Sequence, residues 1–289
     1  MSEPKVVVGY DEGEQSRDAL VLGELVCEAL GGKLVLAHVY PFDPRLRTLS
    51  YADERDAARR AAEELLSGAP LDRFRERNVE RVALPASSPA HGLDQFARDR
   101  DAELIVLGSV HRAPMQRVYP GSVALKLLHG GPCPVAVAPR GYASEPRELR
   151  TVVAAFDGNE EGRRAVLEAG RIAVAAGAQL RLVAVVDTFG AMYIGLERGT
   201  VLDVVEHELR ERVNHLLGEL PAEACCEERL IRGPVTRTLL AEIAEGVDLL
   251  VMGSRGYGPL GSVLLGSVSN DLVQQAPCPV LVVPRRPGG

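Results

Sequence analysis

The chain has 289 residues, of which 46% are hydrophobic and 25% charged, and its formal net charge at pH 7 is −7. This length predicts one large or two ordinary globular domains. The acidic balance argues against a nucleic-acid partner that needs a basic surface, and no apolar run is long enough to span a membrane. The five cysteines show neither a disulfide framework nor a CxxC zinc pattern, and no signal peptide precedes the first strand-like run, so we expect a cytoplasmic protein.

The chain contains one sequence pattern twice. Asp11 in "VVVGYDEG" and Asp157 in "VVAAFDGN" are 146 residues apart, and Gly108 and Gly253, which each end an apolar run, are 145 apart. The segments "GPCPVAVAPR" and "APCPVLVVPR" repeat at the same offset. An offset this constant predicts two homologous domains. We expect them at residues 1–143 and 150–289, joined by the linker "GYASEPREL".

Short apolar runs alternate with helical patterns in each half, most clearly in the second. A buried strand is predicted at 152–156, and a helix at 163–176 has its apolar residues on one face and ends at Gly177. The elements that follow are strands at 179–186, 227–231, 248–252 and 279–283, and helices at 202–217, 235–244 and 267–275. Apolar strands separated by helices predict a parallel sheet covered on both faces. Each half is therefore predicted to be a five-stranded, doubly wound, Rossmann-like α/β sandwich.

The stretch "GSRGYGPLGSVLLGS", residues 253–267, lies between the fourth strand of the second half and the following helix. Ligands of doubly wound sheets bind beyond the carboxyl ends of the strands, where this loop is expected. Glycines allow backbone N–H groups to approach an anion, and the start of a helix at Ser267 adds further donors. The loop therefore suits a phosphate group.

The familiar phosphate-loop patterns do not describe this stretch well. It has no lysine, so the Walker pattern is absent. Residues 256–261 satisfy GxGxxG, but they follow the fourth strand rather than the first and include Pro259, so the match to a dinucleotide-binding fingerprint is weak.

The spacing Gly253, two residues, Gly256, nine residues, Gly266-Ser267 resembles the ATP-binding signature of the universal stress protein family. The resemblance covers nearly the whole chain, twice over. It includes an aspartate at the end of each first strand and a valine near the end of each second strand. It implies the fold of the adenine nucleotide alpha hydrolase group, with the two domains paired as a pseudo-dimer.

The resemblance also implies roles for particular residues of the second half. Asp157 would lie near the base and ribose, and Val185 would contact adenine through its backbone. The ribose and phosphates would be held by the signature residues, which are Gly253, Gly256, Gly266, Ser267, Val268 and Ser269, with Met252 and Arg255 beside them. Each residue alone has a plain structural alternative: the glycines as turn residues, Val185 as core and Asp157 as a helix N-cap. The set together favours adenine nucleotide binding, with ATP, alone or with Mg²⁺, as the expected ligand.

The first half departs from this signature in "GSVHRAPMQRVYPGS", residues 108–122. His111 replaces Gly256 and Ala124 replaces Ser269, which removes a glycine and a hydroxyl from the expected phosphate site. The cations His111, Arg112 and Arg117 are open to two interpretations, a rebuilt anion site or a decayed one, and we favour the decayed site. Weaker nucleotide binding stays open in this half, because the matching residues persist: Asp11, Val39, Gly108, Gly121 and Ser122.

Three classes of function fit this sequence: a nucleotide-binding regulator, a phosphoryl- or adenylyl-transfer enzyme, and a ligand-free scaffold. The enzyme signatures SGGxDS and HxGH of related adenine-binding folds are absent, and the histidines lack metal-ligand spacing. Efficient phosphoryl transfer needs positioned cations and a group that orients the nucleophile. We therefore predict a regulator with no catalytic residues and at most slow ATP hydrolysis. Protein partners are not identified by the sequence, and we expect the last strands of the two domains to pair within the chain, with a homodimer as a further assembly.

Overall fold

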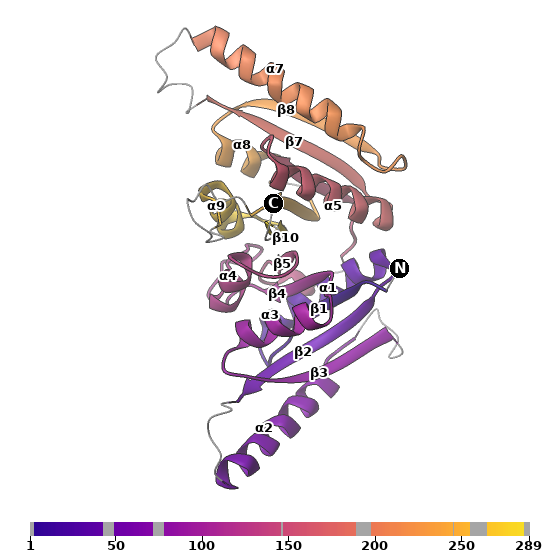
Figure 1. Ribbon diagram of the computed structural model, residues 1–289, viewed down its shortest axis with the longest axis vertical. Coiled ribbons are helices and arrows are strands. Elements are labelled where there is room, and N and C mark those ends of the chain that lie inside the picture. Colours follow the sequence, from indigo (N-terminus) through magenta and orange to yellow (C-terminus); the bar gives the residue numbers. More distant parts are fainter. Residues whose placement is uncertain are drawn as a thin grey trace. The chain divides into compact units, whose positions relative to one another are not determined.

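The computed structural model describes residues 3–42, 49–71, 78–145, 147–188, 198–244, 246–254 and 265–285. The chain divides into two compact units, Met1–Arg147 and Glu148–Gly289. Each unit has its own parallel sheet and its own helices (Figure 1). The expected pairing of the two domains stays a prediction.

The first unit has five parallel strands in the order β3-β2-β1-β4-β5. Its elements are β1 (Lys5–Gly9), α1 (Glu14–Leu30), β2 (Lys33–Pro41), α2 (Leu49–Ser67), β3 (Val79–Ala86), α3 (Pro89–Asp99), β4 (Leu104–Gly108), α4 (Ser122–Leu128), β5 (Val135–Ala138) and the 3-10 turn η2 (Tyr142–Ser144).

The second unit repeats this order as β8-β7-β6-β9-β10, again with every strand parallel. Its elements are β6 (Thr151–Phe156), α5 (Glu160–Ala176), β7 (Gln179–Asp187), α7 (Arg198–Leu217), β8 (Cys226–Gly233), α8 (Val235–Glu242), β9 (Leu249–Gly253), α9 (Ser267–Gln275) and β10 (Val280–Val283). The predicted doubly wound α/β fold is confirmed, and every strand and helix predicted in the second half is present.

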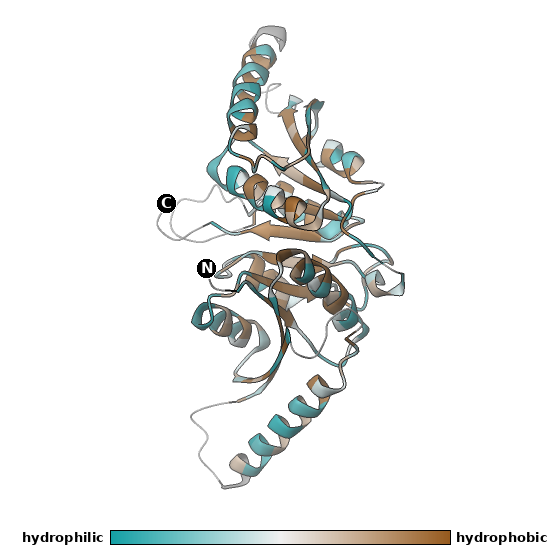
Figure 2. Cartoon of the chain, turned by 90° about the vertical axis from the view of Figure 1, so that its right-hand side faces the viewer, coloured by the Kyte–Doolittle hydropathy of each residue, from teal (hydrophilic) through white to brown (hydrophobic). Residues whose placement is uncertain are grey.

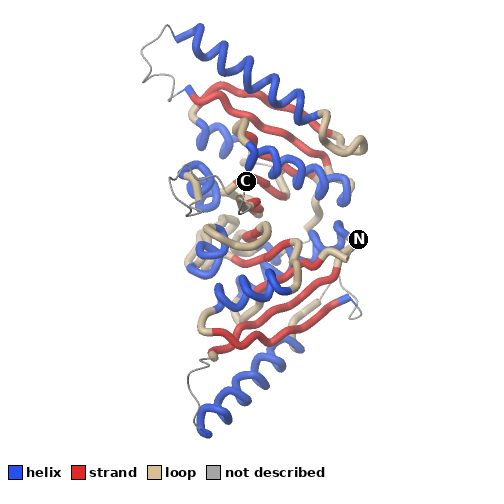
Figure 3. Tube along the Cα trace, viewed as in Figure 1, coloured by secondary structure: helices blue, strands red, loops and turns tan. Residues whose placement is uncertain are grey.

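Helices cover both faces of each sheet (Figure 3). Right-handed crossovers place α1 and α2 on one face and α3 and α4 on the other, and the second unit follows the same rule. The central strands are fully enclosed, because the side chains of Val6, Val7 and Val8 in β1 and of Val152 and Val153 in β6 are 0% exposed. Figure 2 shows the inner strands of each unit mainly toward the hydrophobic end of the scale. Burial of each such side chain contributes about 1.5–3 kcal/mol, so these strands fix the sheet.

The helix ends follow from local sequence. Gly31 after α1 and Gly177 after α5 adopt φ of 61° and 65°, the left-handed conformation that ends a helix most easily at glycine. The helix α5 begins at Glu160, three residues before the predicted start, because the Asn159 side chain accepts a hydrogen bond from the Gly162 N–H at 2.7 Å. The helix therefore begins directly after the short loop, residues 157–159, that follows β6.

A buried carboxylate holds the last turn of the first unit. The side chain of Asp18 in α1 accepts hydrogen bonds from the N–H groups of Gly141 and Ala143, both at 2.8 Å. Burial raises the pKa of Asp18, and the two N–H donors oppose that rise. The equivalent position in α5, 146 residues later, is Arg164, so the second unit lacks this carboxylate.

Among the described residues, no helix combines the length and the apolar composition needed to cross a bilayer.

Candidate functional site

A cavity of about 640 Å³ lies at the carboxyl ends of the strands of the second unit. This volume is within the range of small-molecule and cofactor sites, about 300–1,000 Å³. Its lining includes four of the predicted residues at strand ends, namely Asp157, Val185, Met252 and Gly253. Four more come from the start of α9, namely Gly266, Ser267, Val268 and Ser269. The two remaining predicted residues of this half, Arg255 and Gly256, lie outside the described residues.

Asp157 directly follows β6 and does not cap the helix that comes next. The cap is Asn159, whose amide Nδ2 also donates to the Asp157 carboxylate at 2.9 Å. A Cβ atom on Gly162 would lie 2.6 Å from Asp157 Oδ1, so the glycine leaves room for the carboxylate against the first turn of α5. The helix-cap interpretation of Asp157 is therefore wrong, and its carboxylate lines the cavity.

The start of α9 presents backbone donors to the cavity. Asn270 N–H makes the first bond within the helix, to the Gly266 carbonyl at 2.8 Å. The N–H groups of Ser267, Val268 and Ser269 precede this bond, and donors at that position of a helix suit an anion. The exposed Ser267 hydroxyl adds one more donor at the same place.

One predicted phosphate contact needs correction. The Ser269 side chain is 7% exposed, and its hydroxyl donates to the Gly253 carbonyl at 3.0 Å. Because a hydroxyl has a single proton to donate, this side chain ties α9 to β9 and has no proton left for a phosphate. The backbone N–H of Ser269 remains a candidate donor, and Ser267 remains the hydroxyl candidate.

The glycines that end β4 and β9 have a packing reason of their own. A Cβ on Gly253 would lie 3.0 Å from the backbone carbon of Glu161, and a Cβ on Gly108 would lie 2.0 Å from the backbone oxygen of Gln15. Gly253 lets the first turn of α5 approach the end of β9, and Gly108 lets the first turn of α1 approach the end of β4. Glycine at these two positions therefore does not by itself indicate a ligand.

Sequence reasoning missed one wall of the cavity. Val205, Glu208, Leu209 and Arg212 of α7 line it, at the spacing of residues on one face of a helix. The available signal was the same i, i+3, i+4, i+7 spacing, but valine and leucine on an amphipathic helix read equally well as ordinary core contacts. His207 and His215 of the same helix are solvated, since their side chains are 75% and 82% exposed.

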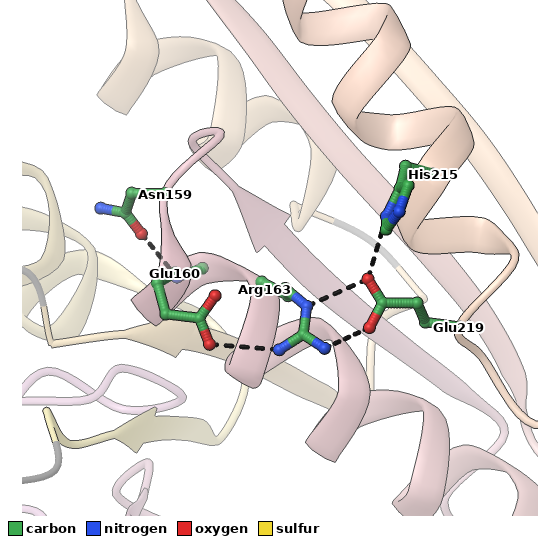
Figure 4. Close-up of polar contacts among 6 residues, drawn as sticks. Asn159, Glu160, Arg163, His215 and Glu219 are labelled. Atoms are coloured by element: carbon green, nitrogen blue, oxygen red, sulfur yellow. Dashed lines mark hydrogen bonds and ion pairs between the residues drawn. The ribbon is translucent and has the colours of Figure 1, made fainter. Parts of the chain in front are cut away.

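Ion pairs hold the carboxyl-terminal end of α7 to the start of α5 (Figure 4). The guanidinium of Arg163 donates to both carboxylate oxygens of Glu219, and it also pairs with Glu160 at 3.1 Å. His215 Nδ1 lies 3.1 Å from Glu219 Oε1. The hydrogen bond from Arg163 is the main cause that lowers the pKa of Glu219. This network positions α7 beside the cavity.

In the first unit, the aspartate that corresponds to Asp157 is bonded by protein groups. Asp11 Oδ1 accepts hydrogen bonds from the Ser16 hydroxyl at 2.6 Å and from the Gly13 N–H at 2.8 Å. Ser16 is 3% exposed and stands 146 residues before Gly162. A serine in place of the glycine thus puts a hydroxyl directly on the carboxylate.

The signature loop of the first unit is folded on itself. Val110 N–H donates to the Tyr119 carbonyl at 2.9 Å, and Tyr119 N–H donates to the Ser109 hydroxyl at 3.0 Å. Arg140 joins the loop to the segment after β5, with its guanidinium donating to the Ala113 carbonyl at 2.9 Å. Backbone donors used within the loop are not presented to an anion. This arrangement favours the interpretation of a decayed site.

The other candidate residues of the first unit occupy the expected elements. Val39 lies near the end of β2, where a Cβ on Gly92 of α3 would be 3.0 Å from its side chain. Gly121 precedes α4 and the exposed Ser122 begins it. Ala124 is 2% exposed at the place of Ser269, so the hydroxyl bond to the strand end is lost. His111, Arg112 and Arg117 are exposed.

The model of the universal stress protein family matches residues 4–139 and again residues 148–284. The chain belongs to the universal stress protein family. A universal stress protein of Mycobacterium tuberculosis is 27% identical over 297 residues, with 96% of this chain and 99% of the relative covered. A universal stress protein of Thermus aquaticus is 37% identical over 140 residues, which are 47% of this chain and 98% of the relative.

Solved structures agree on the fold. The crystal structure of a universal stress protein from Archaeoglobus fulgidus matches with a TM-score of 0.70 and 19% identity, and it covers 99% of this chain and 100% of that chain. The family and the tandem arrangement predicted from the sequence are confirmed.

Proposed function

We propose that the second unit binds an adenine nucleotide, with ATP as the expected ligand, and that the protein is a cytoplasmic stress-response regulator whose nucleotide occupancy changes its contacts with partners. One observation carries this proposal: eight residues predicted from the ATP-binding signature and its neighbouring strands line a single cavity. They come from three strand ends and one helix start. Their meeting in one cavity therefore depends on the packing of four elements and not on a single motif.

The residues present fit a nucleotide. Asp157 and the backbone of Val185 would hold the nucleoside, and the start of α9 with Ser267 would hold the phosphates. Among the described residues, no three His, Cys, Asp or Glu side chains are grouped to hold a metal ion. Any Mg²⁺ would therefore enter on the phosphates, which is the usual way that this ion is bound beside a nucleotide.

Regulation is favoured over catalysis by the charged groups of the lining. Within the described part of the chain, these groups are Asp157, Asp187, Glu208 and Arg212. A single arginine among three carboxylates is a poor setting for the charge that develops during phosphoryl transfer. A slow ATPase or transferase on this fold is the alternative, and turnover of many ATP molecules per chain would favour it. A scaffold without ligand is the other alternative.

The phosphate part of the proposal is tested by a matched pair of serines, Ser267 and Ser122, which begin α9 and α4. A hydrogen bond to a charged group contributes roughly 1.5–3 kcal/mol, and about 1.4 kcal/mol is a factor of ten in affinity. Ser267→Ala should thus weaken ATP binding about tenfold or more in calorimetric titrations and weaken adenosine much less. Ser122→Ala should leave both affinities unchanged. Unchanged ATP affinity in a folded Ser267→Ala protein would make the loop a structural turn.

A further inference from the structure

The face of α7 that lines the cavity carries one cation, and nothing in the signature accounts for it. Arg212 is the single positively charged side chain in the lining, among the residues that the structure describes. Its neighbours on the same face, Val205, Glu208 and Leu209, complete the wall. The position of this arginine depends on contacts within the second unit alone.

Arg212 is held at the loop that follows β6. Its Nη1 donates a hydrogen bond to the Gly158 carbonyl at 3.1 Å. Gly158 has φ of 82°, and a Cβ on it would lie 3.2 Å from both Arg212 Nη1 and Leu209 Cδ1. Glycine at this position therefore allows α7 to approach closely, and the equivalent residue of the first unit is Glu12. Because Gly158 lies between Asp157 and Asn159, this bond holds the guanidinium to the loop that carries Asp157, and both Arg212 and Asp157 line the cavity.

The guanidinium has donors left for a ligand. It carries five N–H groups in a planar fork, and the Gly158 carbonyl accepts from one of them. The carboxylate of Glu208 lies 3.9 Å away, which is too long for a hydrogen bond. The side chain is 58% exposed while it lines the cavity, so the remaining donors face solvent or a ligand. Purine ring nitrogens and ribose oxygens are acceptors of the right kind for such a fork.

We propose that Arg212 is a binding residue for the nucleoside part of the ligand, with its guanidinium donating to an acceptor of the base or ribose. The proposal rests on the proposed nucleotide binding and adds a fifth element, α7, to the site. Because Arg212 lies at the Asp157 loop, it acts on the nucleoside and not on the phosphates held at α9. Adenosine and ATP should then depend on it to the same degree.

The test is calorimetric titration of full-length wild-type, Arg212→Gln and Arg212→Lys proteins with ATP and with adenosine. Arg212→Gln should weaken both ligands by a similar factor, about tenfold, which corresponds to about 1.4 kcal/mol. Arg212→Lys should recover part of the loss, since it keeps a cationic donor without the fork. The control is Arg210→Gln, because Arg210 pairs with Glu206 at 2.9 Å on another face of α7, and it should leave both affinities unchanged.

Analogues separate a direct contact from a positioning effect. The penalty of Arg212→Gln should disappear for one of seven analogues of adenosine that each lack a single acceptor: 2′-, 3′- or 5′-deoxyadenosine, carbocyclic adenosine, or 1-, 3- or 7-deazaadenosine. An equal penalty for all seven would overturn the direct contact and make Arg212 a residue that positions the Gly158 loop. A penalty for ATP alone, or none for either ligand, would also overturn it. If wild-type protein binds neither ligand, it is the proposed nucleotide binding that fails.

Discussion

The two units share a core and differ at the ends of their strands. In the first unit, Ser16 donates to Asp11, and the loop after β4 bonds to itself. In the second unit, Gly162 replaces that serine, and the corresponding Asp157 lines a cavity. The same fold thus carries a self-bonded edge in one unit and a cavity in the other. This is possible because buried strands fix a parallel sheet, while its carboxyl edge is built from loops that can change without loss of the core.

The largest effect is expected from removing the two aspartates separately. Asp157→Ala should weaken both ATP and adenosine by about tenfold or more, since both ligands contain the nucleoside that this carboxylate orients. Asp11→Ala should leave ligand affinity unchanged and lower the free energy of unfolding by roughly 1–3 kcal/mol, because the proton of the buried Ser16 hydroxyl loses its acceptor. Titration calorimetry and denaturant unfolding measure the two effects. Equal loss of affinity in both variants would show that the units bind alike.

A serine exchange between the units should have a smaller effect. Gly162→Ser copies the first unit into the second, and its Cβ would meet Asp157 Oδ1 at 2.6 Å. The carboxylate must then move, so ATP affinity should fall several-fold while the sheet stays folded by circular dichroism. The reverse change, Ser16→Gly, should not create a second site, because the self-bonded loop remains. A second ATP per chain in Ser16→Gly protein would mean that the serine alone blocks the first unit.

The smallest difference between the two units is expected in their buried cores. Cys133 and Cys278 lie 145 residues apart before the last strands, and burial raises the pKa of each thiol to about 12. The reactive thiolate is thus scarce in both units at pH 8, and it becomes available only when the chain unfolds. A thiol reagent should label the exposed Cys225 first and label Cys133 and Cys278 at similar, much slower rates, as followed by mass spectrometry. Faster labelling of one of the two would show that the cores differ in stability.

The sequence was sufficient for the fold because its signals are local. Apolar strands, and glycines such as Gly177 that end helices, determine where elements begin and end, and the constant offset shows that the pattern occurs twice. The carboxyl edge could be predicted too, since Asp157 and Ser267 directly follow a strand or begin a helix.

Contacts between distant elements could not be predicted in this way. The approach of Arg212 to Gly158 joins residues 54 positions apart, and the helix that carries it reads as an ordinary amphipathic surface helix. The bond from the Ser269 hydroxyl to Gly253 likewise depends on the packing of α9 against β9, which no spacing encodes.

The most direct test of the difference between the two units is the number of nucleotides that the full chain binds. Native protein should be purified without added nucleotide, and its bound adenine nucleotide extracted and counted per chain. Nucleotide-free protein should then be titrated with ATP by calorimetry. The account predicts one tight site per chain, abolished or strongly weakened by Asp157→Ala and unaffected by Asp11→Ala. Two equal tight sites would contradict the difference between the units, and no site at all would contradict nucleotide binding.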